Sequence, residues 1–153
     1  RNHGQLRGEF VVAAGNYRMT EMAAALGLAQ LQRLDDIVGR RRQLAALYRD
    51  ILPPELELQQ TPKGAESNYQ TFGAILPQGY DRSAFVRTMR DRGVEAGLLS
   101  FAIHKLGSFA GSDASLPIAE HVAARGIALP LYPQMRDAEV EQVATVLSGA
   151  LHG

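Results

Sequence analysis

The feature that most constrains the fold is a helical pattern from Thr20 to about Asp50. Thr20 suits the N-cap position, and Pro53-Pro54 ends the pattern. We therefore expect one long helix over residues 20–52, bent or broken at Gly39, that connects two parts of a larger protein or packs against a partner. Its apolar residues recur at spacings near three and four, as in an amphipathic helix: Met22, Leu26, Ala29, Leu34, Ile37, Leu44, Leu47, Tyr48 and Ile51.

A polar loop leads into this helix and contains Gly15, Asn16 and Arg18. Glycine and asparagine tolerate the positive φ of a sharp turn. The start of a helix also favours negative charge, so a loop with Asn16 and Arg18 as donors is suited to bind an anion such as a phosphate. The alternative on these residues alone is that Asn16 only turns the chain and Arg18 makes a structural ion pair.

The second half of the chain predicts strands that alternate with helices. We expect an α/β (α+β) fold in which the long helix is followed by a small two-layer α/β sandwich. The expected parts are residues 1–19, the connecting helix 20–52 and the small domain 53–153. Pro130 cannot donate a ladder hydrogen bond, so the last strand is expected at an edge of the sheet. The expected strands are 56–58, 69–76, 94–99 and 127–131, and the expected helices follow Asp81, Pro117 and Asp137.

Composition excludes several functional classes. Sixteen basic and sixteen acidic side chains cancel, which gives no indication of nucleic acid or anionic membrane as a partner. No apolar run approaches the roughly 18 residues that span a bilayer. The chain has no cysteine and no paired-histidine zinc motif, so we expect no metal site. Arg40-Arg41-Arg42 is interpreted as a solvated face paired with Asp35 and Asp36.

Few residues are candidates for chemistry. His104 follows an apolar run, and a lone histidine there is either structural or a base. The two lysines, Lys63 and Lys105, lack a context that would lower the pKa of an amine. We expect no catalytic residue in the chain.

An ordered set of motifs resembles the DegT/StrS family of sugar aminotransferases, which are pyridoxal-phosphate enzymes of fold type I. The resemblance covers essentially the whole chain, which is similar to the C-terminal part of such an enzyme. The matching residues are Arg1-Asn2-His3-Gly4, Gly15-Asn16-Tyr17-Arg18-Met19-Thr20-Glu21, Ala24-Ala25, Gln30-Leu31, Arg41-Arg42, Tyr48, Ser67-Asn68-Tyr69-Gln70, Arg92-Gly93-Val94, His104 and Leu129-Pro130-Leu131-Tyr132-Pro133-Gln134-Met135.

The resemblance implies roles for three residues. Asn16 matches an asparagine that reaches the cofactor phosphate of the neighbouring subunit. Arg18 matches an arginine near that interface, and His104 a histidine near the substrate entrance; both are therefore candidate substrate-binding residues. The family's cofactor-binding lysine lies upstream of Arg1, so this chain alone is expected to be inactive and to hold no covalent cofactor.

The resemblance further implies a cytoplasmic homodimer with shared active sites. The intact enzyme would move an amino group from glutamate or glutamine to a keto sugar or keto-cyclitol. Departures from the family include Arg136, where members often carry a threonine that caps the last helix. The alternatives are a non-catalytic binding or regulatory module and a dimerisation domain that retain the small-domain fold.

Overall fold

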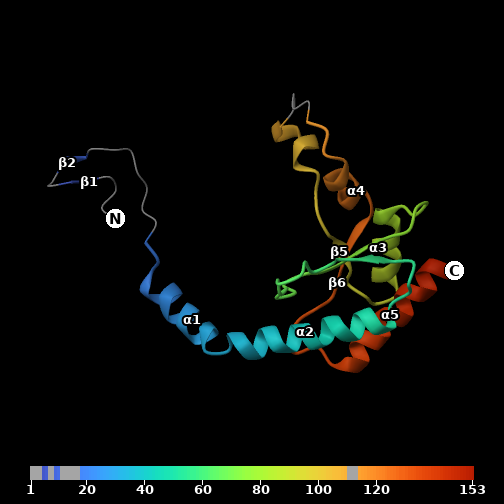
Figure 1. The fold of residues 1–153 in the computed structure, drawn as a ribbon, viewed down its shortest axis with the longest axis horizontal. Coiled ribbons are helices and arrows are strands. Elements are labelled where there is room, and N and C mark those ends of the chain that lie inside the picture. The colour runs from blue at the N-terminus through green and yellow to red at the C-terminus, as the bar shows by residue number, and fades with distance from the viewer. Residues whose placement is uncertain (1–4, 7–8, 11–17, 110–113) are drawn as a thin grey trace. The chain divides into compact units, whose positions relative to one another are not determined.

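A computed structural model describes residues 5–6, 9–10, 18–109 and 114–153 (Figure 1). The chain forms two compact units, residues 1–36 and 37–153. In the described residues, no helix is both long and apolar enough to cross a membrane.

The first unit holds a short antiparallel pair of strands and one helix. Strand β1 (Gln5–Leu6) pairs with β2 (Glu9–Phe10), and α1 spans Glu21–Leu31. The N-cap prediction is confirmed, because Thr20 Oγ1 accepts a hydrogen bond from the Ala23 N–H at 3.2 Å. Apolar side chains surround α1 rather than forming a stripe, and none of its residues is buried.

The expected single helix is two helices, because α2 (Leu34–Ile51) starts after a turn at Gln32 and Arg33. The Arg33 N–H donates to the Gln30 carbonyl at 3.0 Å, which tightens and ends α1. Asp35 and Asp36 then lie in the first turn of α2, where negative charge is favourable. The expected bend or break at Gly39 does not occur.

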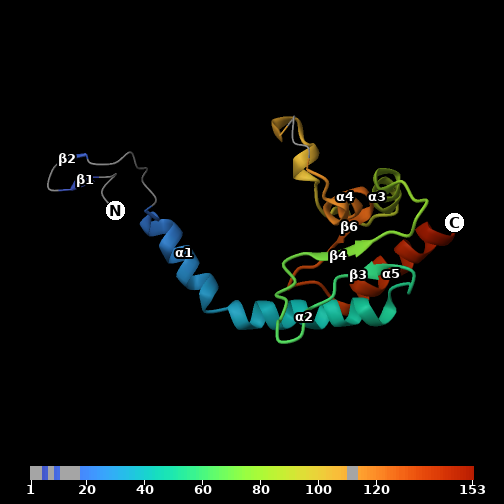
Figure 2. The ribbon, with the colours of Figure 1, turned by 45° about the horizontal axis from the view of Figure 1, so that its top comes forward.

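The second unit is built on a four-stranded antiparallel sheet in the order β3-β4-β6-β5. Helices α2 and α5 lie along one face of the sheet, and α4 lies on the side away from α2 (Figure 2). The bounds are β3 Glu57–Leu58, β4 Phe72–Ile75, α3 Arg82–Asp91, β5 Gly97–Leu98, α4 Pro117–Arg125, β6 Gly126–Leu129 and α5 Asp137–His152, with two 3-10 turns at Ile103–Lys105 and Gly107–Phe109.

The edge position predicted for the 127–131 strand is wrong, because β6 lies between β4 and β5. Pro130 follows the last paired residue, Leu129, so its missing N–H removes no ladder bond. β4 is also shorter than expected. Tyr69 has φ +44°, and the side chains of Ser67 and Asn68 accept from the next-but-one N–H groups at 3.1 Å, which holds a turn instead of a strand.

Helix ends follow local chemistry. The Asp81 carboxylate accepts from the Ala84 N–H at 2.5 Å, at the helix start that the sequence predicts, and Gly93 takes φ +84° beyond the end of α3. At the start of α5, the Glu139 carboxylate reaches back and accepts from the Arg136 N–H at 2.7 Å, which is the Glu half of a capping box.

Tyr48 is the centre of the core. The fully buried ring stacks on Phe72 with centroids 4.9 Å apart, and its hydroxyl donates to the Pro130 carbonyl at 2.8 Å. Burial raises the pKa of Tyr48. Leu44 of α2 and Val140 and Leu147 of α5 belong to the same buried cluster, so α2, α5 and the sheet share one core.

Contrary to the interpretation as a solvated face, Arg40, Arg41 and Arg42 of α2 contact segments far away in the sequence. Arg40 binds the Met135 carbonyl at 2.7 Å and Asp137 at 2.8 Å. Arg42 donates to the Ser67 carbonyl at 2.9 Å and pairs with Glu66 at 2.8 Å. These bonds connect α2 to the loop before β4 and to the start of α5.

Tyr48→Phe is expected to lower the free energy of unfolding by about 1 kcal/mol, because it removes the hydroxyl bond to Pro130 and leaves the stacking intact. Urea unfolding measures the change. The exposed Tyr132→Phe is the matched control, and an equal effect of the two substitutions would contradict the assigned role.

Gly126→Ala is expected to cost about 2 kcal/mol or more, because its Cβ would lie 2.5 Å from the Val122 carbonyl oxygen and 3.1 Å from Leu99. Gly39→Ala meets nothing within 4 Å and is expected to stabilise the chain by up to about 1 kcal/mol. Thermal or urea unfolding of both variants checks the pair, and a Gly126→Ala variant as stable as the parent would refute the packing.

Candidate functional site

The structure describes only part of the predicted cofactor loop. Asn16 lies outside the described residues, so its role stays a prediction. Arg18 is described and exposed, two residues before the Thr20 cap. The anion-binding role of this loop also stays a prediction.

The structure describes His104, whose role at the substrate entrance stays a prediction. It lies in the 3-10 turn Ile103–Lys105, and only 8% of its side chain is exposed. Its Nε2 lies 3.0 Å from Oε1 of Glu120, which belongs to the first turn of α4. The histidine is therefore held by a carboxylate 16 positions further along the chain.

Glu120 joins two neighbouring side chains. Lys105 Nζ donates to Oε2 of Glu120 at 2.5 Å, while His104 occupies Oε1. The Leu116 N–H also points at Oε1, at 3.4 Å. We call His104, Lys105 and Glu120 the carboxylate clasp. It ties the 3-10 turn to the beginning of α4.

The electrostatics of the clasp follow from its contacts. The hydrogen bond from Lys105, and next the one from His104, lower the pKa of Glu120 to about 2. The carboxylate is thus ionised at neutral pH and can only accept hydrogen bonds. In contrast, His104 Nδ1 is buried and has no hydrogen-bond partner among the described residues.

The clasp orders a segment with an apolar surface. Residues 101–109 project from the sheet beyond α4 (Figure 1). Their exposed side chains are large and apolar, which is typical of a surface that contacts another group or protein: Phe101, Ile103, Leu106 and Phe109.

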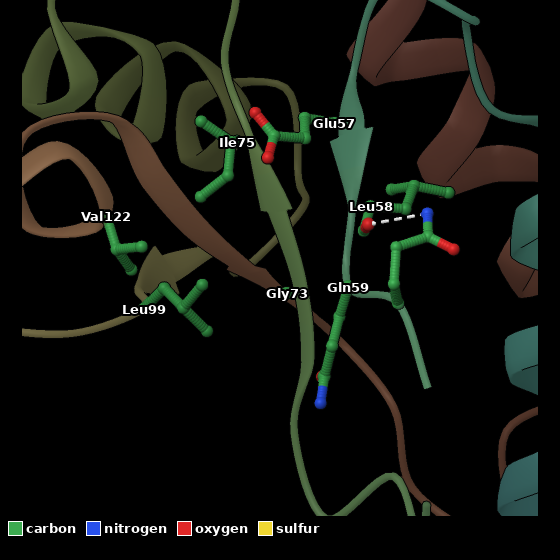
Figure 3. Close-up of a pocket in the computed structure, with 8 residues that line it drawn as sticks. Glu57, Leu58, Gln59, Gly73, Ile75, Leu99 and Val122 are labelled. Carbon is green, nitrogen blue, oxygen red and sulfur yellow. Dashed lines mark hydrogen bonds between the residues drawn. The ribbon is translucent and has the colours of Figure 1, made fainter. Parts of the chain in front are cut away.

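A separate pocket of about 370 Å³ lies against the sheet. Ile75, Leu99 and Val122 gather on one side of β4, and Gly73 leaves room there for Leu99 (Figure 3). Its polar groups come from Glu57 and from glutamines of the same segment, without a second ionisable side chain. His104 does not line this pocket.

Neither lysine suits covalent attachment of pyridoxal phosphate. Lys63 is in an exposed turn, and the ammonium of Lys105 is paired with Glu120. The expectation that the cofactor-binding lysine lies outside this chain stays a prediction.

Sequence reasoning missed Glu120. The only signal was an acidic residue in the first turn of a helix that begins with Pro117, which is favourable for that helix by itself. Nothing in the spacing connected Glu120 with His104, because the intervening segment decides how the two approach.

Glu120→Gln is expected to lower stability at neutral pH. The pKa of Glu120 is depressed from 4.5 to about 2 in the folded chain, so its contribution is complete above about pH 4.5 and is lost as the pH falls towards 2. Urea unfolding at several pH values should show the two chains converge in that window. The exposed Glu141→Gln serves as control, and a parent–variant difference that persists at pH 2 would contradict the assignment.

Comparison with known proteins defines the family. A model of the DegT/DnrJ/EryC1/StrS aminotransferase family matches residues 1–148. GDP-perosamine synthase of Escherichia coli O157:H7 is 28% identical over 125 residues, covering 82% of this chain and 34% of the relative. A dTDP-4-dehydro-2,3,6-trideoxy-D-glucose 4-aminotransferase of Saccharopolyspora spinosa is 35% identical over 128 residues, covering 81% and 32%.

Solved structures agree with this relation. The aminotransferase TlmJ of Streptoalloteichus hindustanus has 29% identity and a TM-score of 0.83, covering 94% of this chain and 39% of that chain. DesI, solved in the presence of its TDP-sugar product, has 27% identity and a TM-score of 0.84, with 97% and 40% covered. The chain spans about a third to two fifths of the length of these proteins. It shares their fold along nearly its whole length and belongs to the DegT/DnrJ/EryC1/StrS aminotransferase family.

Proposed function

We propose that this chain is the C-terminal part of a pyridoxal-phosphate-dependent sugar aminotransferase. The whole enzyme would transfer an amino group from glutamate or glutamine to a keto sugar or keto-cyclitol. The observation that carries the proposal is the family match over residues 1–148, together with relatives whose names specify nucleotide-linked sugars. When bound, the cofactor supplies an electron sink for this chemistry.

Three residues of this chain have proposed roles in the site. Asn16 would donate a hydrogen bond to the cofactor phosphate of a neighbouring subunit, and the start of α1 behind it favours that negative charge. Arg18 would bind an anionic group of the substrate or hold the loop. His104 would contact the substrate through Nδ1, since Glu120 already occupies Nε2.

The surface of α1 supports an assembly with shared sites. A helix that is apolar on all sides is normally buried, yet Met22 is 85% exposed, Leu26 63% and Leu28 64%. We infer that further protein covers α1 in a cytoplasmic homodimer, where the loop before α1 would reach the partner's site. The same exposure favours the second candidate, a dimerisation domain without catalysis.

The assay must separate the two candidates and uses the whole encoded protein beside this 153-residue chain. The whole protein is expected to bind pyridoxal phosphate and to transfer the amino group of glutamate or glutamine to a nucleotide-linked keto sugar. The 153-residue chain alone is expected to do neither. A whole protein that dimerises but neither binds the cofactor nor transfers an amino group would support the dimerisation domain instead.

Asn16→Ala in the whole protein is expected to weaken cofactor binding about tenfold or more, because a hydrogen bond to a charged phosphate is lost. Equilibrium titration with pyridoxal phosphate measures the change. Gln78→Ala, an amide residue in an exposed turn, is the control. Unchanged affinity in Asn16→Ala would remove Asn16 from the site.

A further inference from the structure

The carboxylate clasp leaves one polar atom unpaired. Both oxygens of Glu120 are occupied, Oε1 by His104 and Oε2 by Lys105, whereas Nδ1 of His104 is buried without a hydrogen-bond partner among the described residues. Buried polar atoms are normally paired, so an orphaned ring nitrogen beside a fully engaged carboxylate calls for a physical explanation.

The chemistry of Glu120 decides which ring nitrogen carries the proton. An ionised carboxylate only accepts hydrogen bonds, so the nitrogen 3.0 Å away must donate. In the neutral ring of His104 the proton is therefore on Nε2, and Nδ1 presents a lone pair. The opposite tautomer would aim two acceptors at each other and bury an N–H group at Nδ1 with nothing to accept it.

Lys105 holds the carboxylate of Glu120 in place, and this carboxylate in turn holds the ring of His104. Its ammonium binds Oε2, while the Leu116 N–H approaches Oε1 at the start of α4. Glu120 is thus held from two directions, and its Oε1 faces the imidazole in one orientation. Lys105 itself makes no hydrogen bond to His104, so it acts on the ring only through Glu120.

We propose that Glu120 is a positioning residue that holds His104 as the Nε2–H tautomer, so that Nδ1 can accept a hydrogen bond from an O–H or N–H group of a ligand. A hydroxyl or amino group of a sugar is the matching donor. The identification of the ligand as a sugar rests on the proposed function, because the substrate role of His104 rests on that function. The tautomer itself depends only on residues of this chain.

The direct test is side-chain NMR of the ¹⁵N-labelled chain at about pH 8, above the ordinary histidine pKa of about 6.5. His104→Gln identifies the His104 signals among those of the four histidines. The expected spectrum shows a protonated Nε2 and an unprotonated Nδ1. A protonated Nδ1, or a mixture of the two tautomers, would overturn the proposal.

Three variants separate positioning from mere stability. Glu120→Ala is expected to remove the tautomer preference of His104. Glu120→Gln should retain it, because the single amide oxygen accepts from Nε2 while the largely exposed Lys105 turns to solvent. Lys105→Met should retain it because Lys105 does not touch the ring. His121 is the internal reference in each spectrum. An unchanged His104 tautomer in folded Glu120→Ala would refute the role of Glu120.

The ligand part is tested in the whole protein with a nucleotide-linked keto sugar. Glu120→Ala is expected to raise KM about tenfold with a smaller change in kcat, whereas Glu120→Gln stays near the parent. Equal KM values in the parent and Glu120→Ala would refute the ligand contact. The tautomer measurement needs neither cofactor nor substrate, so its failure leaves the proposed function standing and is distinguishable from a failure of that function.

Discussion

The burial of Tyr48 is the interaction on which the second unit depends. Its ring stacks on Phe72 of β4, and its hydroxyl bonds to the Pro130 carbonyl just beyond β6. One side chain thus fixes α2 to two neighbouring strands at once. Arg40 and Arg42 extend this attachment to the start of α5 and to the loop before β4. Since Leu44, Ala45 and Tyr48 also belong to the buried apolar cluster, α2 is an integral part of the small domain as well as its connection to α1.

The two units differ in how much of their own apolar surface they bury. Helix α2 buries Leu44, Ala45 and Tyr48 within the second unit, whereas α1 buries nothing and is apolar on every side. That contrast supports a larger assembly around α1. On the second unit, the carboxylate clasp orders the 101–109 segment, whose apolar side chains also face outwards. The residues proposed to act on cofactor and substrate are attached to these two uncovered surfaces.

Capping residues and prolines in the sequence correctly predicted where helices begin, because a helix start depends on residues close by in the chain. Thr20 and Asp81 cap their helices, and Pro117 begins α4 as expected. Features set by distant contacts were missed, because periodicity carries no information about partners. The arginines of α2 bind remote loops, β6 is an internal strand, and Glu120 meets His104. The resemblance identified the family correctly, while the role of Asn16 stays a prediction outside the described residues.

The central claim is that this chain completes a cofactor site whose lysine lies outside residues 1–153. Reductive trapping of pyridoxal phosphate on the whole encoded protein, followed by peptide mapping, tests it most directly. The account predicts one modified lysine in the part of the protein beyond this chain, and no specific modification of Lys63 or Lys105. A cofactor adduct on either of those two lysines, in amounts equal to the bound cofactor, would contradict it.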